Sequence, residues 1–466
     1  MNFATGAFLL FLPVVWAVHW LLPWARARKI WLLVASYYFY ACWDWRFLGL
    51  IAASTAIDYL AGLAMPDGAA PRRRRAALLV SLVANLGILA VFKYAGFFAD
   101  SFVALAHTIG WNVGSATLDI VLPVGISFFT FQSMSYTIDR YRGTIATCRD
   151  PLDFALFVAF FPQLVAGPIV RARDFLPQLE TPRAMHRADL VEGAERILRG
   201  LAKKVVVADT LADVVDRLFA QPDEVGMLGA WVAAMAFAGQ IYCDFSGYSD
   251  VAIGAARLLG YRLPENFRHP YLSRSPREFW QRWHISLSTW LRDYLYISLG
   301  GNRGGTRATR RNLLWTMLLG GLWHGAAWTY VAWGAWHGAW LAASRETVAR
   351  GVLRWPLQPI AGWFATLLIV LFGWVAFRAE TLADAAVLLG AMVGIHGGGL
   401  GDPVAWAPFA VVLVPVATHA LAALDETSGR GIRANAFYRV TVATGAALGI
   451  VTFWRLEPTA FIYFQF

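Results

Sequence analysis

The sequence is poor in charged residues. Only 15% of its 466 residues are Asp, Glu, Lys or Arg, whereas 58% are hydrophobic, and an average soluble domain is about a quarter charged. This balance argues against a water-soluble globule. Uncharged runs that could cross about 30 Å of hydrocarbon recur along the chain, at residues 76–92, 312–344, 355–377 and 403–424. We therefore expect an all-α polytopic membrane protein, in which residues 312–344 form two short helices.

Cysteine is also scarce, and several nucleotide-binding and hydrolase motifs are missing. Cys42, Cys148 and Cys243 are widely separated, and they show neither a CxxC pair nor a metal-ligand spacing. The chain has no Walker motif, GxSxG elbow, HExxH pair or dinucleotide fingerprint. ATP-driven transport and metallohydrolysis therefore lose their usual support, and we expect no metal.

The formal net charge is +10, and the basic residues gather in loops between apolar runs. Such loops mark the cytoplasmic side of a membrane protein. Arg26, Arg28 and Lys29 follow the first apolar segment, and residues 72–75 follow the third, which predicts an external N-terminus. Residues 5–24 lack a basic n-region and a cleavage site, so we expect a retained helix. Nucleic-acid binding is disfavoured because no basic surface alternates with a soluble core.

Simple alternation of spans fails in the middle of the chain. Residues 154–168 are short, broken by Pro162 and flanked by positive charge, which predicts a re-entrant element with irregular backbone buried in protein. Residues 201–218 fit either a span or an interfacial helix. Residues 227–260 read as a span followed by a polar bend, and residues 265–311 are basic and cytoplasmic.

We expect one membrane domain, residues 1–466, with roughly 10 to 13 transmembrane or re-entrant helices. Its parts would be N-terminal spans at 1–117, a core with re-entrant and cytoplasmic helices at 118–346 and C-terminal spans at 347–466.

Histidines inside apolar segments are the first candidates for chemistry, because ionisable groups are costly there. His324 and His337 lie in the uncharged run, and His284 lies in the segment REFWQRWHISLSTWLRDY. A neutral imidazole is the least costly titratable group to bury, and it is the form that a general base needs. The other six are expected to serve packing or the surface: His19, His107, His186, His269, His396 and His419.

His324 is flanked by Trp323 and Trp328, with Gly325 leaving room for a substrate. Packing of tryptophan and glycine between helices explains the same pattern equally well. On an ideal helix, His337 lies roughly 140° around from His324. The two histidines could share a pocket only if the helix broke, for instance near Gly334, so we expect His337 to be structural.

Two polar and aromatic clusters are further candidates. Trp280, His284 and Ser288 follow one helical stripe near Arg277, Arg282 and Arg292. This stripe suits either an interface anchor or the phosphates of a charged acyl donor, since the guanidinium fork matches phosphate oxygens. Asp244, Ser246, Tyr248 and Asp250 could orient a substrate or a histidine, although helix capping explains them as well.

Five segments, taken in order, resemble the membrane-bound O-acyltransferase family, and especially its alginate-type members, with D-alanyl transfer proteins as relatives. They are LPVGISFFTFQSMSYTID (122–139), FFPQLVAGPIVRARDFLPQL (160–179), YCDFSGYSDVAIG (242–254), REFWQRWHISLSTWLRDYLYISLGGNR (277–303) and GGLWHGAAWTYVAWGAWHG (320–338).

The resemblance implies a helical funnel with a catalytic His324 in the WHG motif and a second site residue, His284, in RWHxSLS. It also implies that an acyl thioester, for which we expect acetyl-CoA, enters from the cytoplasm and that the acyl group leaves across the membrane. We expect the substrate to be bound by Arg282, Trp283, Ser288, Trp323, Trp328, Asp244 and Gln132.

The expected function is O-acetylation of an exported polysaccharide such as alginate, from the bacterial inner membrane and together with a periplasmic O-acetyltransferase. Transfer of D-alanyl or another acyl group is an alternative. A transporter or flippase is a second alternative, because broken helices with polar residues at the midplane occur in both classes. The two classes differ in whether acyl label ever reaches an acceptor.

Overall fold

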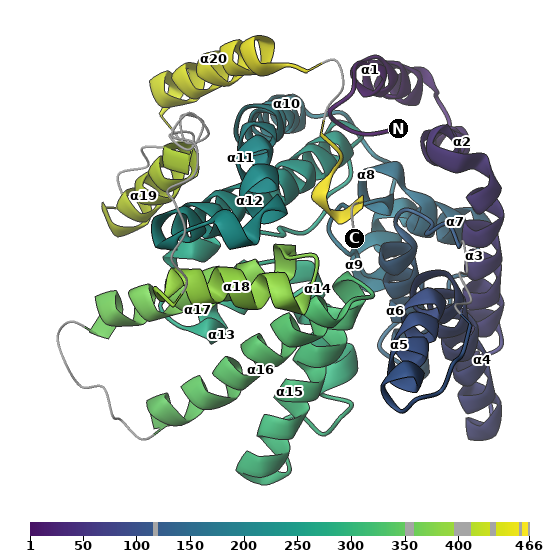
Figure 1. Cartoon of the computed structure of the whole chain (residues 1–466). Coiled ribbons are helices and arrows are strands. Elements are labelled where there is room, and N and C mark those ends of the chain that lie inside the picture. The colour runs from purple at the N-terminus through teal and green to yellow at the C-terminus, as the bar shows by residue number, and fades with distance from the viewer. Residues whose placement is uncertain (115–119, 350–357, 396–411, 429–434, 456–458, 465–466) are drawn as a thin grey trace. The chain divides into compact units, whose positions relative to one another are not determined.

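Every regular element in the described part of the chain is a helix, as Figure 1 shows. The computed structural model describes residues 1–114, 120–349, 358–395, 412–428, 435–455 and 459–464. It divides into two compact units, and two of the three chain boundaries between them, at 194/195 and 251/252, fall within helices. Unit 1 contains Met1–Ala194 and Ala252–Pro264, and unit 2 contains Glu195–Val251 and Glu265–Phe466. The expected all-α architecture is confirmed.

Unit 1 is a packed set of apolar helices in which α3 and α6 contact each other and each also contacts α4 and α7. Pro71 opens α4 at a position where a missing N–H has no cost. Helix α6 begins at Ile126, directly after Gly125, which adopts a left-handed conformation with φ 77°. The elements are α1 (Gly6–Leu21), α2 (Ala25–Asp44), η1 (Trp45–Phe47), α3 (Leu48–Leu63), α4 (Pro71–Leu89), η2 (Ala90–Tyr94), α5 (Ala95–Thr108), α6 (Ile126–Arg142), α7 (Pro151–Ala159), α8 (Phe161–Leu164), α9 (Ala172–Glu180), the first half of α10 (Arg187–Ala202) and the last residues of α12 (Met227–Leu258).

The predicted irregular segment around Pro162 is broken and buried. Helix α7 ends at Ala159, and Phe160 leaves the helical region before the four-residue helix α8 begins. Phe160, Phe161 and Leu164 are fully buried, so the broken backbone lies in protein, as expected. Its entry into a membrane from one side remains a prediction.

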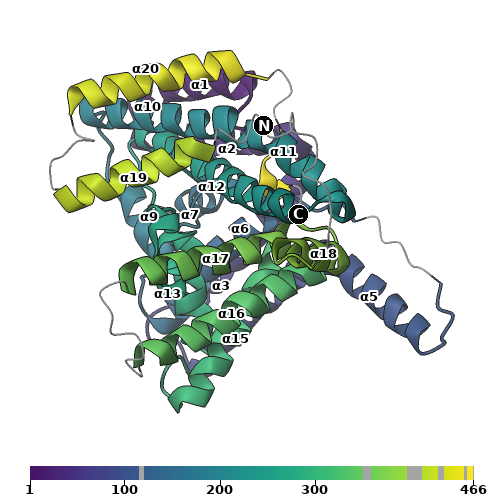
Figure 2. The same cartoon turned by 60° about the vertical axis from the view of Figure 1, so that its left-hand side comes forward.

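Unit 2 contains the longest helix and a tight hairpin of two others. Helices α15 and α16 pack together along their length, and α17 packs on α16 (Figure 2). Its elements are the end of α10, η3 (Lys203–Ala208), α11 (Asp209–Ala220), η4 (Pro222–Glu224), α12 (Met227–Leu258), η5 (Pro270–Leu272), α13 (Pro276–Arg282), α14 (Ile285–Trp290), η6 (Leu291–Tyr296), α15 (Gly305–His324), α16 (Trp328–Ala349), α17 (Gln358–Arg378), α18 (Leu382–Met392), α19 (Leu413–Ser428), α20 (Ala436–Phe453) and η9 (Ile462–Phe464).

Glycines set the distance between the two helices of the hairpin. A Cβ on Gly334 would overlap the carbonyl oxygen of Met317, and one on Gly321 would overlap that of Tyr330. Small residues allow this close approach of helices in membranes. The expectation of two helices in residues 312–344 is therefore confirmed, whereas a helix break near Gly334 is wrong.

The polar bend predicted within residues 227–260 is also wrong. Helix α12 runs without interruption from Met227 to Leu258, so the polar residues 243–250 lie inside it and do not cap its ends. Gly200 and Gly247 let α10 and α12 approach closely, because a Cβ on Gly200 would overlap the carbonyl oxygen of Gly247. Polar side chains of α12 thereby meet basic residues of α10 and η3.

Within the residues that the structure describes, four stretches are long and apolar enough to cross a membrane: Ala25–Leu63, Pro71–Thr108, Pro359–Arg378 and Ala436–Phe453. Their exposed apolar side chains, such as Phe437 at 81% exposure, suit contact with lipid. The protein is therefore a multi-pass membrane protein. His396 and parts of the predicted runs at 355–377 and 403–424 lie outside the described residues.

Candidate active site

His324 is the last residue of α15 and is surrounded by aromatic rings. It is only 5% exposed, and the helix ends there because Gly325 is extended, with φ −159°. A Cβ on Gly325 would overlap the ring of Tyr330, so the turn between α15 and α16 requires glycine. Four ring centroids lie within 6 Å of the imidazole centroid: Trp323 and Trp333 at 5.1 Å, Phe377 at 5.4 Å and Tyr463 at 5.6 Å.

His284 lies at a sharp break between α13 and α14. Its backbone is left-handed, with φ 42° and ψ 54°, which is uncommon for a residue other than glycine. The predicted continuous stripe of Trp280, His284 and Ser288 is therefore wrong. Backbone hydrogen bonds with residues 266–268 stabilise the break. Ile285 N donates to Asn266 O at 2.9 Å, and Arg268 N donates to Arg282 O at 2.9 Å.

The break brings His284 beside His324. Their ring centroids are 6.4 Å apart, and the His284 centroid lies 4.6 Å from that of Phe245 and 5.9 Å from that of Trp323. His284 is completely buried. Two histidines from different elements thus share one aromatic enclosure, which their sequence positions alone do not require.

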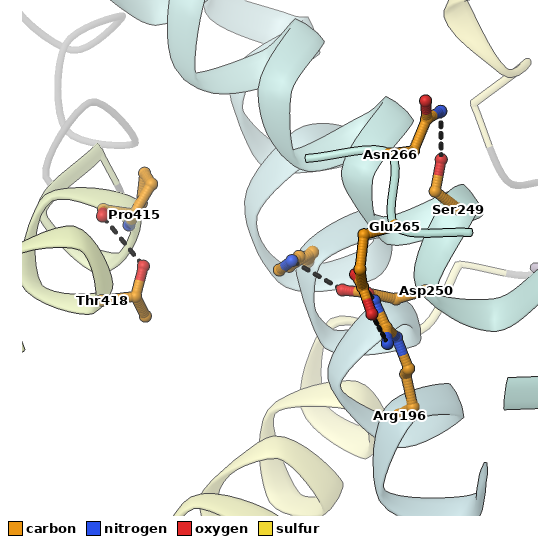
Figure 3. Close-up of polar contacts among 8 residues, drawn as sticks. Arg196, Ser249, Asp250, Glu265, Asn266, Pro415 and Thr418 are labelled. Carbon is orange, nitrogen blue, oxygen red and sulfur yellow. Dashed lines mark hydrogen bonds and ion pairs between the residues drawn. The ribbon is translucent and has the colours of Figure 1, made fainter. Parts of the chain in front are cut away.

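Asn266 connects His284 to the rest of unit 2. Its Oδ1 atom accepts hydrogen bonds from Ser286 Oγ at 2.9 Å and Ser286 N at 3.3 Å, and lies 3.1 Å from His284 Nδ1. Its Nδ2 atom donates to Ser249 Oγ on α12 at 3.1 Å, as Figure 3 shows. All four side chains are at most 5% exposed.

The C-terminal segment reaches the same enclosure. Ile462 N donates to Asp244 Oδ2 at 2.7 Å, and the ring of Tyr463 lies 4.5 Å from that of Phe245 and 5.6 Å from that of His324. Asp244 also pairs with Lys204 at 2.9 Å. Asp244 therefore holds a wall of the enclosure in place, and direct binding of a substrate by Asp244 remains a prediction.

Asp250 belongs to a separate ionic network, drawn in Figure 3. Arg196 Nε donates to Asp250 Oδ1 at 2.9 Å, Lys203 Nζ donates to Asp250 Oδ2 at 2.7 Å, and both terminal nitrogens of Arg196 bind the carboxylate of Glu265. Burial lowers the pKa of Arg196, but Glu265 and Asp250 outweigh this effect and raise it above its usual value. Arg196 thus stays charged and ties α10 to the segment that carries Asn266.

Two of the three arginines considered for the donor, Arg277 and Arg282, line an open pocket of about 470 Å³ beside α13, together with Ser275, Glu278 and Gln281. The third, Arg292, is not part of this lining and pairs with Asp293 at 2.6 Å. Arg282 pairs with Glu278 at 2.9 Å, whereas the exposed Arg277 forms no ion pair with another described residue. Ser288 Oγ donates to Trp283 O at 3.1 Å, and Trp283 is 1% exposed. Arg277 and Arg282 can therefore meet an anion, while Trp283 and Ser288 stabilise the break.

His337 lies near the enclosure but behind Trp333. The Trp333 ring is 5.1 Å from His324 and 5.0 Å from His337, and His337 is also 5.2 Å from the Trp280 ring. The helix-wheel separation of the two histidines does not apply, because residues 325–327 separate two helices. His337 is 1% exposed and packs among aromatic rings, and its expected structural role remains a prediction.

The remaining predicted residues have other surroundings. Trp328 opens α16 and is 54% exposed. Gln132 is fully buried on α6 in unit 1, and its role stays a prediction. His419, expected to serve packing or the surface, is 5% exposed and lies 5.2 Å from the ring of His269.

Sequence analysis missed Asn266, Tyr463 and Lys204. Asn266 lies in a short segment without periodicity, and Tyr463 lies more than a hundred residues from either histidine. No local pattern connects such residues to the site. Among the described residues, no group of three or more His, Cys, Asp or Glu side chains has an arrangement that could hold a metal ion.

Comparisons with known proteins identify the family of the chain. The sequence profile of the membrane-bound O-acyltransferase family matches residues 145–377. A probable alginate O-acetylase of Azotobacter vinelandii is 48% identical over 407 residues, which is 86% of this chain and 80% of the relative. A peptidoglycan O-acetyltransferase of Helicobacter pylori is 35% identical over 83% of this chain and 78% of the relative. A teichoic acid D-alanyltransferase of Bacillus subtilis is 27% identical over 44% of this chain and 54% of the relative. The chain therefore belongs to the membrane-bound O-acyltransferase family and is an O-acyltransferase.

Proposed function

We propose that this protein takes an acetyl group from a cytoplasmic thioester and passes it across the membrane for O-acetylation of an exported polysaccharide such as alginate. The observation that carries this proposal is the pair of buried histidines, with ring centroids 6.4 Å apart inside an aromatic enclosure. The similarity to alginate O-acetylases over most of the chain supports the acetyl group and the polymer.

In the proposed reaction, His324 accepts the proton of an acceptor hydroxyl as the hydroxyl oxygen attacks the thioester carbonyl. A carbon–oxygen bond forms, the carbon–sulfur bond breaks, and the imidazolium returns its proton to the leaving thiolate. General-base assistance of this kind contributes about 10²- to 10⁴-fold. His284 orients the acceptor, and the rings of Trp323 and Trp333 exclude water from the enclosure.

The pocket beside α13 suits the anionic part of acetyl-CoA, our proposed donor. Arg277 and Arg282 both line it, and guanidinium groups bind phosphate oxygens through paired hydrogen bonds. Arg277 carries no competing carboxylate partner within the described residues. We assign this face to the cytoplasm because residues 265–311 are rich in arginine.

Two further assignments rest on charge and on the relatives. We assign the N-terminus to the periplasm from the charge of the basic loops, and the chain to the bacterial inner membrane from its similarity to bacterial alginate O-acetylases. A periplasmic O-acetyltransferase would then receive the acetyl group and modify the polymer.

The alternatives differ in acyl group or in chemistry. D-alanyl transfer is favoured by the match to a teichoic acid D-alanyltransferase, but that match covers only 44% of this chain. Transport without bond making would leave an acyl label on its donor throughout.

The test uses the purified protein in vesicles with acetyl-CoA labelled in the acetyl group, and follows label on a polysaccharide acceptor or on the periplasmic partner. We expect His324→Ala to lose about 10²-fold or more of the transfer. His19→Ala is the control, since His19 is a buried histidine of α1. Wild-type transfer by inserted His324→Ala protein would refute the assignment, and D-alanyl transfer without acetyl transfer would change the cargo.

A further inference from the structure

The hydrogen bonds around Asn266 determine which nitrogen of His284 faces the reaction. Ser286 N is a backbone N–H and can only donate, and it points at the Asn266 side chain at 3.3 Å. The amide atom that receives it must therefore be the oxygen. Asn266 Nδ2 then faces Ser249 Oγ, to which it donates at 3.1 Å. The contact with Ser286 N thus orients the amide, and the hydroxyl of Ser249, which can accept as well as donate, fits this orientation.

The orientation of the amide in turn sets the tautomer of His284. An amide oxygen accepts hydrogen bonds and cannot donate them, so the 3.1 Å contact with His284 Nδ1 requires a proton on Nδ1. In a neutral imidazole the other nitrogen, Nε2, then carries the lone pair. A histidine whose Nδ1–H is held in this way presents Nε2 as a hydrogen-bond acceptor.

We propose that Asn266 is a positioning residue that holds His284 in the Nδ1–H tautomer, so that Nε2 accepts a hydrogen bond from the hydroxyl of the acyl acceptor. This proposal rests on the proposed function, in which His284 orients the acceptor. It excludes the other possible role of a neutral His284, which is donation of a hydrogen bond to the thioester carbonyl, because that role needs the proton on Nε2.

The fold supports this assignment by immobilising Asn266. Its neighbour Glu265 is bound by both terminal nitrogens of Arg196, and Arg196 Nε also donates to Asp250 on α12 at 2.9 Å (Figure 3). The backbone carbonyl of Asn266 accepts from Ile285 N at 2.9 Å. The ion pairs of Glu265 and the backbone hydrogen bond to Ile285 thus fix Asn266 beside the break at which His284 adopts its left-handed conformation.

The direct test reads the tautomer itself. Histidine labelled with ¹⁵N and observed by solid-state NMR in bilayers distinguishes a protonated Nδ1 from a protonated Nε2, and a spectrum of His284→Ala assigns the signal by difference. We expect the Nδ1–H form in the wild type and a mixture of tautomers in Asn266→Leu. An Nε2–H signal for His284 in the wild type would overturn the proposal regardless of enzymatic activity.

A double-mutant cycle tests whether Asn266 acts through His284. We expect Asn266→Leu to lower acetyl transfer about 10- to 100-fold, the range seen when the partner of a metal-bound histidine is removed. Residues that act as a unit are not additive, so Asn266→Leu combined with His284→Ala should be no slower than His284→Ala alone. Asn266→Asp, which keeps an acceptor oxygen at Nδ1, should retain more activity than Asn266→Leu.

Asn312→Leu is the matched control, because Asn312 is a buried asparagine of the same unit whose Nδ2 donates to Gly301 O at 3.0 Å. It should show full additivity with His284→Ala. Full additivity for Asn266→Leu as well would refute the positioning role. If His324→Ala were inactive while His284→Ala kept wild-type activity, the acceptor-orienting role of His284 would fail, and the NMR result would still decide the tautomer.

Discussion

Lys204, Asp209 and Asp244 form a buried ionic triad whose response to mutation can be worked out from its charges. Lys204 Nζ lies 2.9 Å from a carboxylate oxygen of each aspartate, and the three side chains are at most 5% exposed. Lys204→Met would leave two buried carboxylates facing each other without a cation. Removing one partner of a buried pair costs about 3–5 kcal/mol, which is about two to almost four orders of magnitude in the unfolding equilibrium.

Asp244→Asn should cost much less than Lys204→Met. The Lys204 and Asp209 pair remains, and the amide oxygen can still accept from Ile462 N, which now donates to Asp244 Oδ2 at 2.7 Å. Asp244→Leu should retain the pair but release Ile462, and with it the wall formed by Tyr463. Stability in detergent, measured by thermal or denaturant unfolding, and acetyl transfer by the surviving protein check this order.

The ordering of the variants is the decisive result. If Lys204→Met were as stable as the wild type, or if Asp244→Asn were as damaging as Lys204→Met, the electrostatic reasoning would be wrong. If Asp244→Leu stayed folded with undiminished transfer, the C-terminal segment would have no part in the enclosure.

Three further predictions concern the hairpin, the pocket and the second histidine. Gly334→Ala should separate α15 from α16, because its Cβ would overlap Met317 O, and thermal unfolding should show a loss of about 1–3 kcal/mol. Arg277→Ala should raise KM for acetyl-CoA with little change in kcat, whereas Arg274→Ala, on the same segment but outside the pocket, should leave KM unchanged in the same vesicle assay. His337→Phe should keep most acetyl transfer, since an aromatic ring still fills the space beside Trp333, and a loss comparable to that of His324→Ala would show that His337 takes part in the reaction.

Polar residues inside α12 show where local reasoning about this chain failed. Asp, Ser and Gly in residues 243–250 are poor helix formers that favour caps and turns, which is why helix capping was one of the roles predicted for them. In the structure the helix continues, because Asp244 and Asp250 are paired with Lys204 and with Arg196 and Lys203. Partners from a distant helix outweighed the local preference.

The continuous helix predicted through His284 was wrong for a related reason. Here contacts from a distant segment break a helix that the local sequence favours. The apolar and aromatic spacing of residues 277–294 fits one continuous helix, and nothing in that segment indicates a left-handed residue. The competing hydrogen bonds come from residues 266 and 268, which pair with the backbone at 282 and 285. A helical period can be read from one segment, but a break imposed by another segment cannot.

Composition and motif spacing by themselves determined that the chain lies in a membrane, that it is helical and which family it belongs to. They also identified His284 and His324 as candidate site residues. All of these depend on residue types and on their order within short segments. The tertiary structure alone decided that the two histidines lie 6.4 Å apart, that Asn266 faces Nδ1 of His284 and that Tyr463 closes the enclosure. These contacts join segments that are distant in the chain. They depend on helix breaks and on buried ion pairs, whose partners are brought together only when the chain packs.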